Sequence, residues 1–225
     1  MKISGSGTLS AGKIDDDLHV SGSAKLKGDF ECYGFHSSGS LRGEGSLTVH
    51  GDISSSGSFR LGGSLYGDGK AKSSGSMSVG GEISVKGTLV NSGSLRSGNR
   101  VEALEGINIS GSARINGDLL SQRMIKISGS STIHGDVSGN DVVLGREPRI
   151  SRSIYKHLSI IHGSIFAKNQ VDLVRTLVEG DVRGRNVIIG KGTEIRGMVY
   201  YVDNIEVHDK ANLVNEPIQI TERDL

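Results

Sequence analysis

The chain has 225 residues, of which 34 are glycine, 2 are proline, none is tryptophan and 4% are aromatic. Its 26 basic and 25 acidic side chains give a formal net charge of +1, so the overall electrostatics indicate neither a nucleic-acid partner nor an acidic lipid surface. Apolar residues at regular spacing argue against a disordered Gly/Ser linker, and an unbroken repeat favours one domain at this length.

A glycine recurs at almost every sixth position from Gly22 to Gly145, with two inward-type positions between successive glycines. The repeat is plainest in the tripeptide Ser-Gly-Ser, which recurs with a period of about 17 to 18 residues. The tripeptide begins at Ser4, Ser21, Ser38, Ser56, Ser74, Ser92, Ser110 and Ser128. Three hexads therefore make one coil, with three short strands and three tight corners.

The coil that starts at Ser110 indicates which side chains form the core. Alternate residues of a strand point to opposite sides, so one set faces a common interior. The set predicted to face inward here is Ile109, Ala113, Ile115, Leu119, Ser121, Ile125 and Ile127. We attribute the corner glycines to positive φ angles, which glycine adopts without a Cβ penalty. Asn99 and Asp141 replace glycine at two corners, whereas Arg123 at a third has no such explanation.

A single coil cannot bury its apolar face, and stacking solves this by pairing each strand in parallel with the strands above and below. The sequence therefore predicts an all-β fold, a triangular parallel β-helix (solenoid) with coils of about 17 to 18 residues. At about 4.8 Å per coil, about a dozen coils make a rod about 50 to 60 Å long.

Some inward positions are polar. Ser37, Ser55, Ser73 and Asn91 occupy one inward column in four successive coils, and we expect them to hydrogen-bond along the stack. Cys32 also falls on an inward position, where we expect a buried packing thiol. Because one cysteine allows no intrachain disulfide, and no signal peptide or membrane-spanning run is visible, we expect a cytoplasmic location.

A basic stretch after Gly145 interrupts the repeat, since it contains Pro148 and no corner glycine. We interpret it as an inserted loop and a candidate docking site, with Arg146, Arg149, Arg152 and Lys156 as its docking residues. The predicted segments are Gly/Ser-rich coils at 1–145, the loop at 146–159, Val/Ile-rich coils at 160–214, and a cap or tail at 215–225.

Histidine and aspartate at the corners carry no predicted chemistry. His50 and His134 precede Gly-Asp and His162 precedes Gly-Ser, but all three lie outside the inward set. We interpret them as solvated corner residues. The repeated Gly-Asp pairs lack the several acidic ligands per site that calcium-binding repeats need. We therefore predict no catalytic, cofactor-binding or metal-binding residues, and no small-molecule substrate.

The chain resembles the bactofilins, a family of polymer-forming cytoskeletal proteins. The resemblance rests on its glycine-cornered coils and on Gly-Asp repeats such as Gly28-Asp29-Phe30 and Gly135-Asp136-Val137. It is similar in particular to the longer Gram-positive-type members, whose N-terminus also enters the repeat with an Ile-Ser-Gly-type opening. The likeness covers nearly the whole chain.

The resemblance implies a right-handed β-helix that polymerises end to end, without nucleotide, into apolar filaments. It implies a non-enzymatic scaffold for cell shape, motility structures or localised partners, often at the inner face of the membrane. The partners it implies are further copies of the chain, a paralogous bactofilin and membrane-associated proteins. Many bactofilins also have proline-rich tails and a hydrophobic N-terminal anchor, neither of which is obvious here, so the basic loop is a candidate substitute for membrane contact.

The ends of a solenoid expose open strand edges and apolar side chains, which must be capped or paired. We predict that polymerisation at the N-terminal end uses Leu9, Ile14, Leu18 and Val20. At the C-terminal end the candidates are Val199, Tyr200, Tyr201, Val207 and Leu213, unless a short helix or the tail covers them. We expect like ends to meet in pairs.

The alternative function is enzymatic. Left-handed β-helix acyltransferases of the hexapeptide-repeat type are also built from hexads, three to a coil, and the segment from Val187 to Thr193 resembles one of their repeats. Their glycine directly follows the large aliphatic residue, whereas most corner glycines here lie between outward residues. Such enzymes also need a catalytic histidine at a trimer interface, for which His157 is the candidate. An extracellular adhesin is a third class, disfavoured by the low aromatic content and the missing signal peptide.

Overall fold

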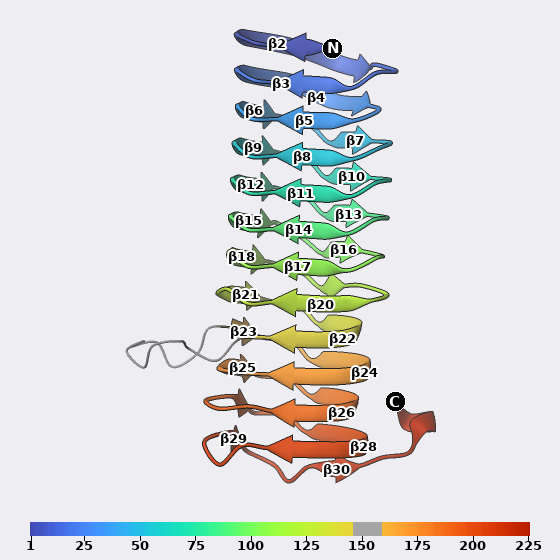
Figure 1. Ribbon diagram of the computed structural model, residues 1–225, viewed down its shortest axis with the longest axis vertical. Helices are drawn as coiled ribbons and strands as arrows, with labels where there is room; N and C mark the ends of the chain where they lie inside the picture. The colour runs from blue at the N-terminus through green and yellow to red at the C-terminus, as the bar shows by residue number, and fades with distance from the viewer. Residues whose placement is uncertain (146–158) are drawn as a thin grey trace.

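The computed structural model describes residues 1–145 and 159–225 (Figure 1). Within these ranges every regular element is a β-strand, apart from one 3-10 turn at Glu222–Asp224. The strands pair in parallel and wind into a solenoid of about 11 coils of about 18 residues each. The predicted all-β solenoid is therefore confirmed.

The coil is right-handed. In Figure 1 the near strands run from right to left, the chain passes behind at the left edge, and it returns on the far side while descending toward the C-terminus. This is the hand expected for crossovers between parallel strands. It differs from the left-handed coil of the acyltransferases considered above.

Three faces, A, B and C, follow one another in that order around each coil. Face A holds β1 (Lys2–Ile3), β3 (Leu18–Val20), β5 (Phe35–Ser37), β8 (Ile53–Ser55), β11 (Ala71–Ser73), β14 (Leu89–Asn91), β17 (Ile107–Ile109) and β20 (Met124–Ile127). Face B holds β6 (Ser40–Gly43), β9 (Ser58–Leu61), β12 (Ser76–Val79), β15 (Ser94–Ser97), β18 (Ser112–Ile115), β21 (Ser131–Ile133), β23 (Ser159–Ile161), β25 (Thr176–Val178), β27 (Glu194–Ile195) and β29 (Asn212–Leu213). Face C holds β7 (Leu47–Val49), β10 (Leu65–Gly67), β13 (Ile83–Val85), β16 (Val101–Ala103), β19 (Leu119–Leu120) and β30 (Ile218–Gln219).

Six longer strands bend around a corner. Two of them, β2 (Ser6–Lys13) and β4 (Ser23–Cys32), pass from face B to face C. Four pass from face C to face A: β22 (Val137–Leu144), β24 (Ile165–Leu173), β26 (Val182–Ile189) and β28 (Val199–Val207). The coils before and after the undescribed segment are continuous, because Ser131 pairs with Ser159 and Ile133 with Ile161. Strand β23 thus begins at Ser159, just before the predicted resumption of the repeat at 160.

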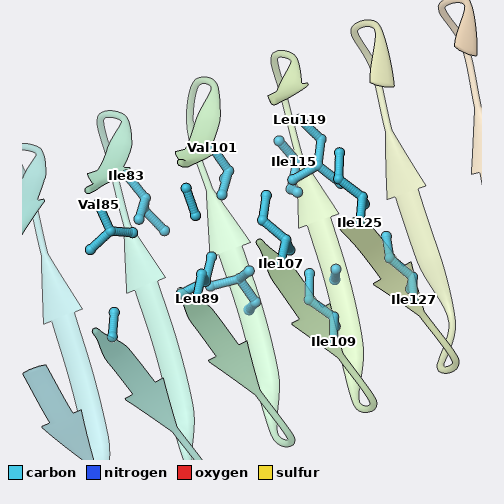
Figure 2. Packing of buried hydrophobic residues seen from close by; sticks show 14 of the residues in the cluster. Ile83, Val85, Leu89, Val101, Ile107, Ile109, Ile115, Leu119, Ile125 and Ile127 are labelled. Atoms are coloured by element: carbon cyan, nitrogen blue, oxygen red, sulfur yellow. The ribbon is translucent and has the colours of Figure 1, made fainter. Parts of the chain in front are cut away.

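The core is a single narrow column of side chains inside the triangle, as Figure 2 shows for the middle coils. The inward residues predicted for the coil from Ser110 are buried, except that Ser121 is partly exposed. Phe35 and Phe59 lie edge to face at 5.4 Å between ring centroids. Each fully buried Leu, Ile or Val contributes about 1.5 to 3 kcal/mol relative to an exposed one. This burial along the rod axis holds each coil to its neighbours.

The corner glycines of the Ser-Gly-Ser motif are needed for space between coils, and our attribution to positive φ was wrong for them. None of them has a positive φ; the left-handed glycines among the described residues include Gly28 and Gly106. A Cβ on Gly111 would lie 1.8 Å from the carbonyl oxygen of Gly93 in the preceding coil. Asn99 and Asp141 do not have positive φ either, whereas Arg175 does, at 52°.

The inward polar column is buried as predicted, but it does not form the expected hydrogen-bonded ladder. Ser55, Ser73 and Asn91 are at most 2% exposed, and their side-chain polar atoms have no hydrogen-bond partner among the described residues. The fourth member of this column, Ser37, donates a hydrogen bond from its hydroxyl to the Gly39 carbonyl oxygen at 3.5 Å. Equivalent positions on adjacent strands are about 4.8 Å apart, which is too far for a hydrogen bond between two hydroxyls unless their rotamers turn toward each other.

Candidate functional site: the two ends of the solenoid

The N-terminal end is an open sheet edge. Among the described residues, β1 pairs only with β3, and β2 pairs only with β4, so one side of each first-coil strand has no partner. Unpaired backbone N–H and C=O groups along an edge are a template for pairing with another chain. The first coil is also held in place, because the amino group of Met1 binds the Asp16 carboxylate at 3.3 Å.

Three aliphatic side chains cover this end, one on each face. Ile3, Leu9 and Ile14 are partly exposed and pack on the core below them. Ile3 is in register with Val20, and Leu9 with Leu26. Sequence reasoning found Leu9 and Ile14 but missed Ile3, although it lies one coil before the inward Val20 and could have been found from the period of the repeat.

Leu18 and Val20 do not belong to this end surface. They are 0% and 2% exposed, because the strand β1 lies over them and completes the first coil. The prediction that they contact a second copy is corrected accordingly.

The C-terminal end has a second open edge. Within the described residues, β29 pairs only with β27, and the second half of β28 pairs only with β26. Val207 is 47% exposed, and Leu213 and Tyr201 are partly exposed. Ile205 and Ala211 belong to the same end, although the sequence analysis did not predict them as contact residues.

Two predicted C-terminal contact residues lie elsewhere. Val199 is fully buried at the start of β28, where the extra strand β30 lies over face C. Tyr200 faces outward on face C, where the guanidinium of Arg183 lies over its ring at 4.7 Å from the centroid. The end surface therefore consists of Tyr201, Ile205, Val207, Ala211 and Leu213.

The tail leaves most of this end uncovered. Its strand β30 pairs with Tyr200 and Tyr201 and so adds a short strand to face C. The chain then turns back along the outside of the rod, as Figure 1 shows. There Glu222 forms an ion pair with Arg185, and Arg183 donates to the carbonyl of Asp224 at 3.1 Å. The tail is thus neither a full cap nor a free segment.

A row of alternating charges runs along the corner that follows face C. Glu31 lies between Lys13 and His50, at 2.9 and 2.7 Å, and Asp68 lies between His50 and Lys86, at 3.1 and 2.8 Å. The hydrogen bonds that the His50 ring donates to the carboxylates of Glu31, which has the larger effect, and Asp68 raise the pKa of His50. The bond to His50 in turn lowers the pKa of Glu31. This row links five successive coils at the surface.

Face B carries a second row of charge, which the sequence analysis missed. Outward positions in register hold Lys25, Arg42, Arg60, Arg96 and Arg114, with Ser78 between the two arginine pairs. Lys25 binds Glu44 at 2.8 Å. None of the four arginine side chains forms an ion pair or hydrogen bond with the described residues. Because like charges directly opposite each other destabilise a sheet, neighbouring arginines in this row repel each other without a compensating acidic partner among those residues. Serine hydroxyls flank the row, and two shallow hollows open beside it.

The corner histidines are solvent-exposed and the cysteine is buried. His50, His134 and His162 are exposed at corners, as expected, and the rings of His134 and His162 stack at 4.7 Å. Cys32 is buried, and burial raises the pKa of its thiol to about 12. In the part of the chain that the structure describes, no three His, Cys, Asp or Glu side chains are arranged to hold a metal ion.

The loop residues Arg146, Arg149, Arg152 and Lys156, and also His157, lie outside the described residues. In the described ranges, no helix has the length and apolar character needed to span a membrane. Comparison with models of protein families, with curated proteins and with solved structures found no match to this chain.

Proposed function

We propose that this protein is a bactofilin-like cytoskeletal scaffold that assembles end to end into filaments without nucleotide. The observation that carries the proposal is the pair of open ends, each with unpaired strand edges and exposed aliphatic side chains. Solenoids normally need polar capping repeats for solubility, and neither end has one among the described residues. Association of the ends satisfies both the backbone groups and the apolar surface.

The resemblance to bactofilins supports nucleotide-independent assembly and the role of a scaffold for cell shape, motility structures or envelope-associated proteins. The proposal includes a cytoplasmic location with peripheral contact at the inner face of the membrane. It also includes a non-enzymatic role, in which the protein acts through its surfaces. A paralogous chain with matching ends is a further proposed partner.

A scaffold also needs a lateral surface for its partners, and the arginine row on face B supplies a candidate. Arginine forks bind carboxylates with two hydrogen bonds, and the adjacent pairs Arg42 with Arg60 and Arg96 with Arg114 repeat that fork along the rod. The outward positions of this face carry no aromatic side chain from Ser23 to Arg114, which disfavours stacking of nucleic-acid bases. The proposed partner is an acidic protein segment.

Substitution at the two ends tests the assembly proposal. Leu9→Lys and Val207→Lys each place a charge on an end surface, so each is expected to abolish polymer that pellets on ultracentrifugation. The matched controls are Leu120→Lys and Val90→Lys, which change partly exposed residues of the same type on the sides of the rod. The controls are expected to pellet like the unmodified chain.

Two results would contradict the proposal. One is unchanged pelleting of both end variants, and the other is an unmodified chain that remains monomeric at every concentration tested. Circular dichroism on each variant separates loss of assembly from loss of fold.

A further inference from the structure

The chain begins and ends at different places around the coil. The order of the faces is A, B, C, and the chain enters on face A with β1 and makes its last strand on face C with β30. The final complete coil consists of the two halves of β28 on faces C and A and of β29 on face B. Strand β30 then adds one more layer on face C alone. The C-terminal end therefore carries a step that is one strand high.

The N-terminal end has the complementary step. After β30 on face C, the next position in the right-handed path is face A, and β1 is the strand that a second copy places there. Strand β2 of that copy then follows on faces B and C. We propose that copies of this chain join head to tail, so that β1 and β2 of one copy continue the solenoid after β30 of the other. This inference rests on the proposed end-to-end assembly and contradicts our expectation that like ends meet.

The inward side-chain columns of faces A and B match across such a junction. Following the paired residues along face A places Ile3 of the second copy over Val207. The same count on face B places Leu9 over Leu213. Exposed or partly exposed aliphatic side chains therefore meet aliphatic side chains on faces A and B, whereas on face C the same count places Ile14 over Gln219.

The outward columns at the junction are also compatible. Lys2 comes to lie over Glu206, two exposed residues of opposite charge one strand spacing apart. Thr8 comes to lie over Asn212, which are both neutral and exposed. In this arrangement no like charges face each other in these columns.

The tail does not obstruct this junction. After β30 the chain runs back toward earlier coils, where Arg185 binds Glu222 and Arg183 binds the Asp224 carbonyl. Both arginines belong to β26, which lies one coil before β28. The end surface beyond Val207 and Leu213 is therefore free to receive a second copy.

Like ends fit less well. When two C-terminal ends meet about a twofold axis, the strand β30 of each copy can lie against the last strand of one face of the other copy. Two of the three faces are then closed, but the third face has no extra strand from either copy. That face keeps a gap of about 4.8 Å, one strand spacing, with unpaired backbone groups on both sides. The head-to-tail junction leaves no such gap.

Disulfide cross-linking tests the polarity. The double variant Thr8→Cys with Asn212→Cys places two thiols at opposite ends of one rod, so neither can reach the other within a chain. In a head-to-tail junction their Cα atoms lie about 4.8 Å apart, within the range for a disulfide. Mild oxidation of polymer, followed by non-reducing gel electrophoresis, is expected to give a ladder of dimers, trimers and longer chains. The single variants Thr8→Cys and Asn212→Cys are the controls and are expected to stay monomeric on the gel.

The outcomes separate this inference from the proposed function. Dimers from either single variant show that like ends meet and overturn the inference, as does a double variant that pellets as polymer but gives no ladder. In both cases end-to-end assembly survives, because the polymer itself is measured by pelleting before oxidation. Absence of pelletable polymer from the unmodified chain overturns the proposed function and this inference together.

Discussion

The substitution Gly111→Ala tests whether the coil-to-coil contact at the corners requires glycine. The new Cβ would lie 1.8 Å from the Gly93 carbonyl oxygen, and protein Cβ atoms do not approach other atoms closer than 3.0 Å. Because a close-packed stack has no spare room beside that carbonyl, the two coils must separate locally by about 1 Å. The same carbonyl accepts a hydrogen bond from the amide of Ser112 at 3.0 Å, and the amide of Ser110 donates to Asn91 at 2.9 Å.

The expected cost follows from these contacts. Two backbone hydrogen bonds lengthened by about 1 Å lose about 0.5 to 1.5 kcal/mol each, and the packing between the coils weakens as well. We therefore expect a loss of about 2 to 4 kcal/mol in the free energy of unfolding. For a chain of this size that corresponds to a fall of about 5 to 15 °C in Tm.

Thermal unfolding followed by circular dichroism measures this effect, at a concentration where sedimentation shows monomer. The matched control is Gly5→Ala, in the same Ser-Gly-Ser motif at the N-terminal end, where a Cβ would meet no atom within 4 Å. Its expected change is at most about 0.5 kcal/mol. Equal Tm values for the two variants would refute the argument, since they would show that the motif matters through local conformation and not through contact between coils.

Three further predictions concern single side chains. Ser73→Ala removes a buried hydroxyl that has no partner among the described residues, so we expect an unfolding free energy higher by about 1 to 2 kcal/mol in chemical denaturation, and a decrease would contradict this. The interactions that raise the pKa of His50 stabilise the fold fully below about pH 6.5, and this stabilisation is lost as the pH rises through the folded-state pKa. The Tm of the unmodified chain should therefore exceed that of His50→Gln by more at pH 5.5 than at pH 8.5. The buried thiol of Cys32, with a pKa of about 12, should resist iodoacetamide at pH 8 until urea unfolds the chain, as mass spectrometry would record.

The repeat made the fold predictable from sequence. The constant period of the Ser-Gly-Ser motif and the two inward positions per hexad locate the core residues of most coils, because the strand period and the coil period together fix which side chains face the interior. The handedness was implied by the family resemblance and not by the period. The structure then assigns it directly, through the path of the chain in Figure 1.

The reason for the corner glycines was not predictable in the same way. Local conformation and contact with the neighbouring coil both favour glycine, and a single sequence does not distinguish them. Only the stacked coils show that the Gly93 carbonyl occupies the place of a Cβ on Gly111. The hydrogen bonding of the inner polar column likewise depends on rotamers, which the spacing of Ser55 and Ser73 does not determine.

The candidate site was predictable only in part. Leu9, Ile14, Val207 and Leu213 were assigned to the ends correctly, since they lie in the first and last coils of the frame. Leu18 was misplaced by one coil, and Val199 lies beneath the single extra strand β30. Short edge strands such as β1 have too few residues for their pairing to be evident from sequence, and pairing by one such strand is enough to bury the coil beneath it.

Negative-stain electron microscopy of the purified, tag-free chain tests the central claim most directly. The measurement uses no nucleotide and covers a range of salt and protein concentration. The account predicts filaments one solenoid wide that lengthen as the protein concentration rises. Isolated rods or compact trimers under all of these conditions would contradict end-to-end assembly.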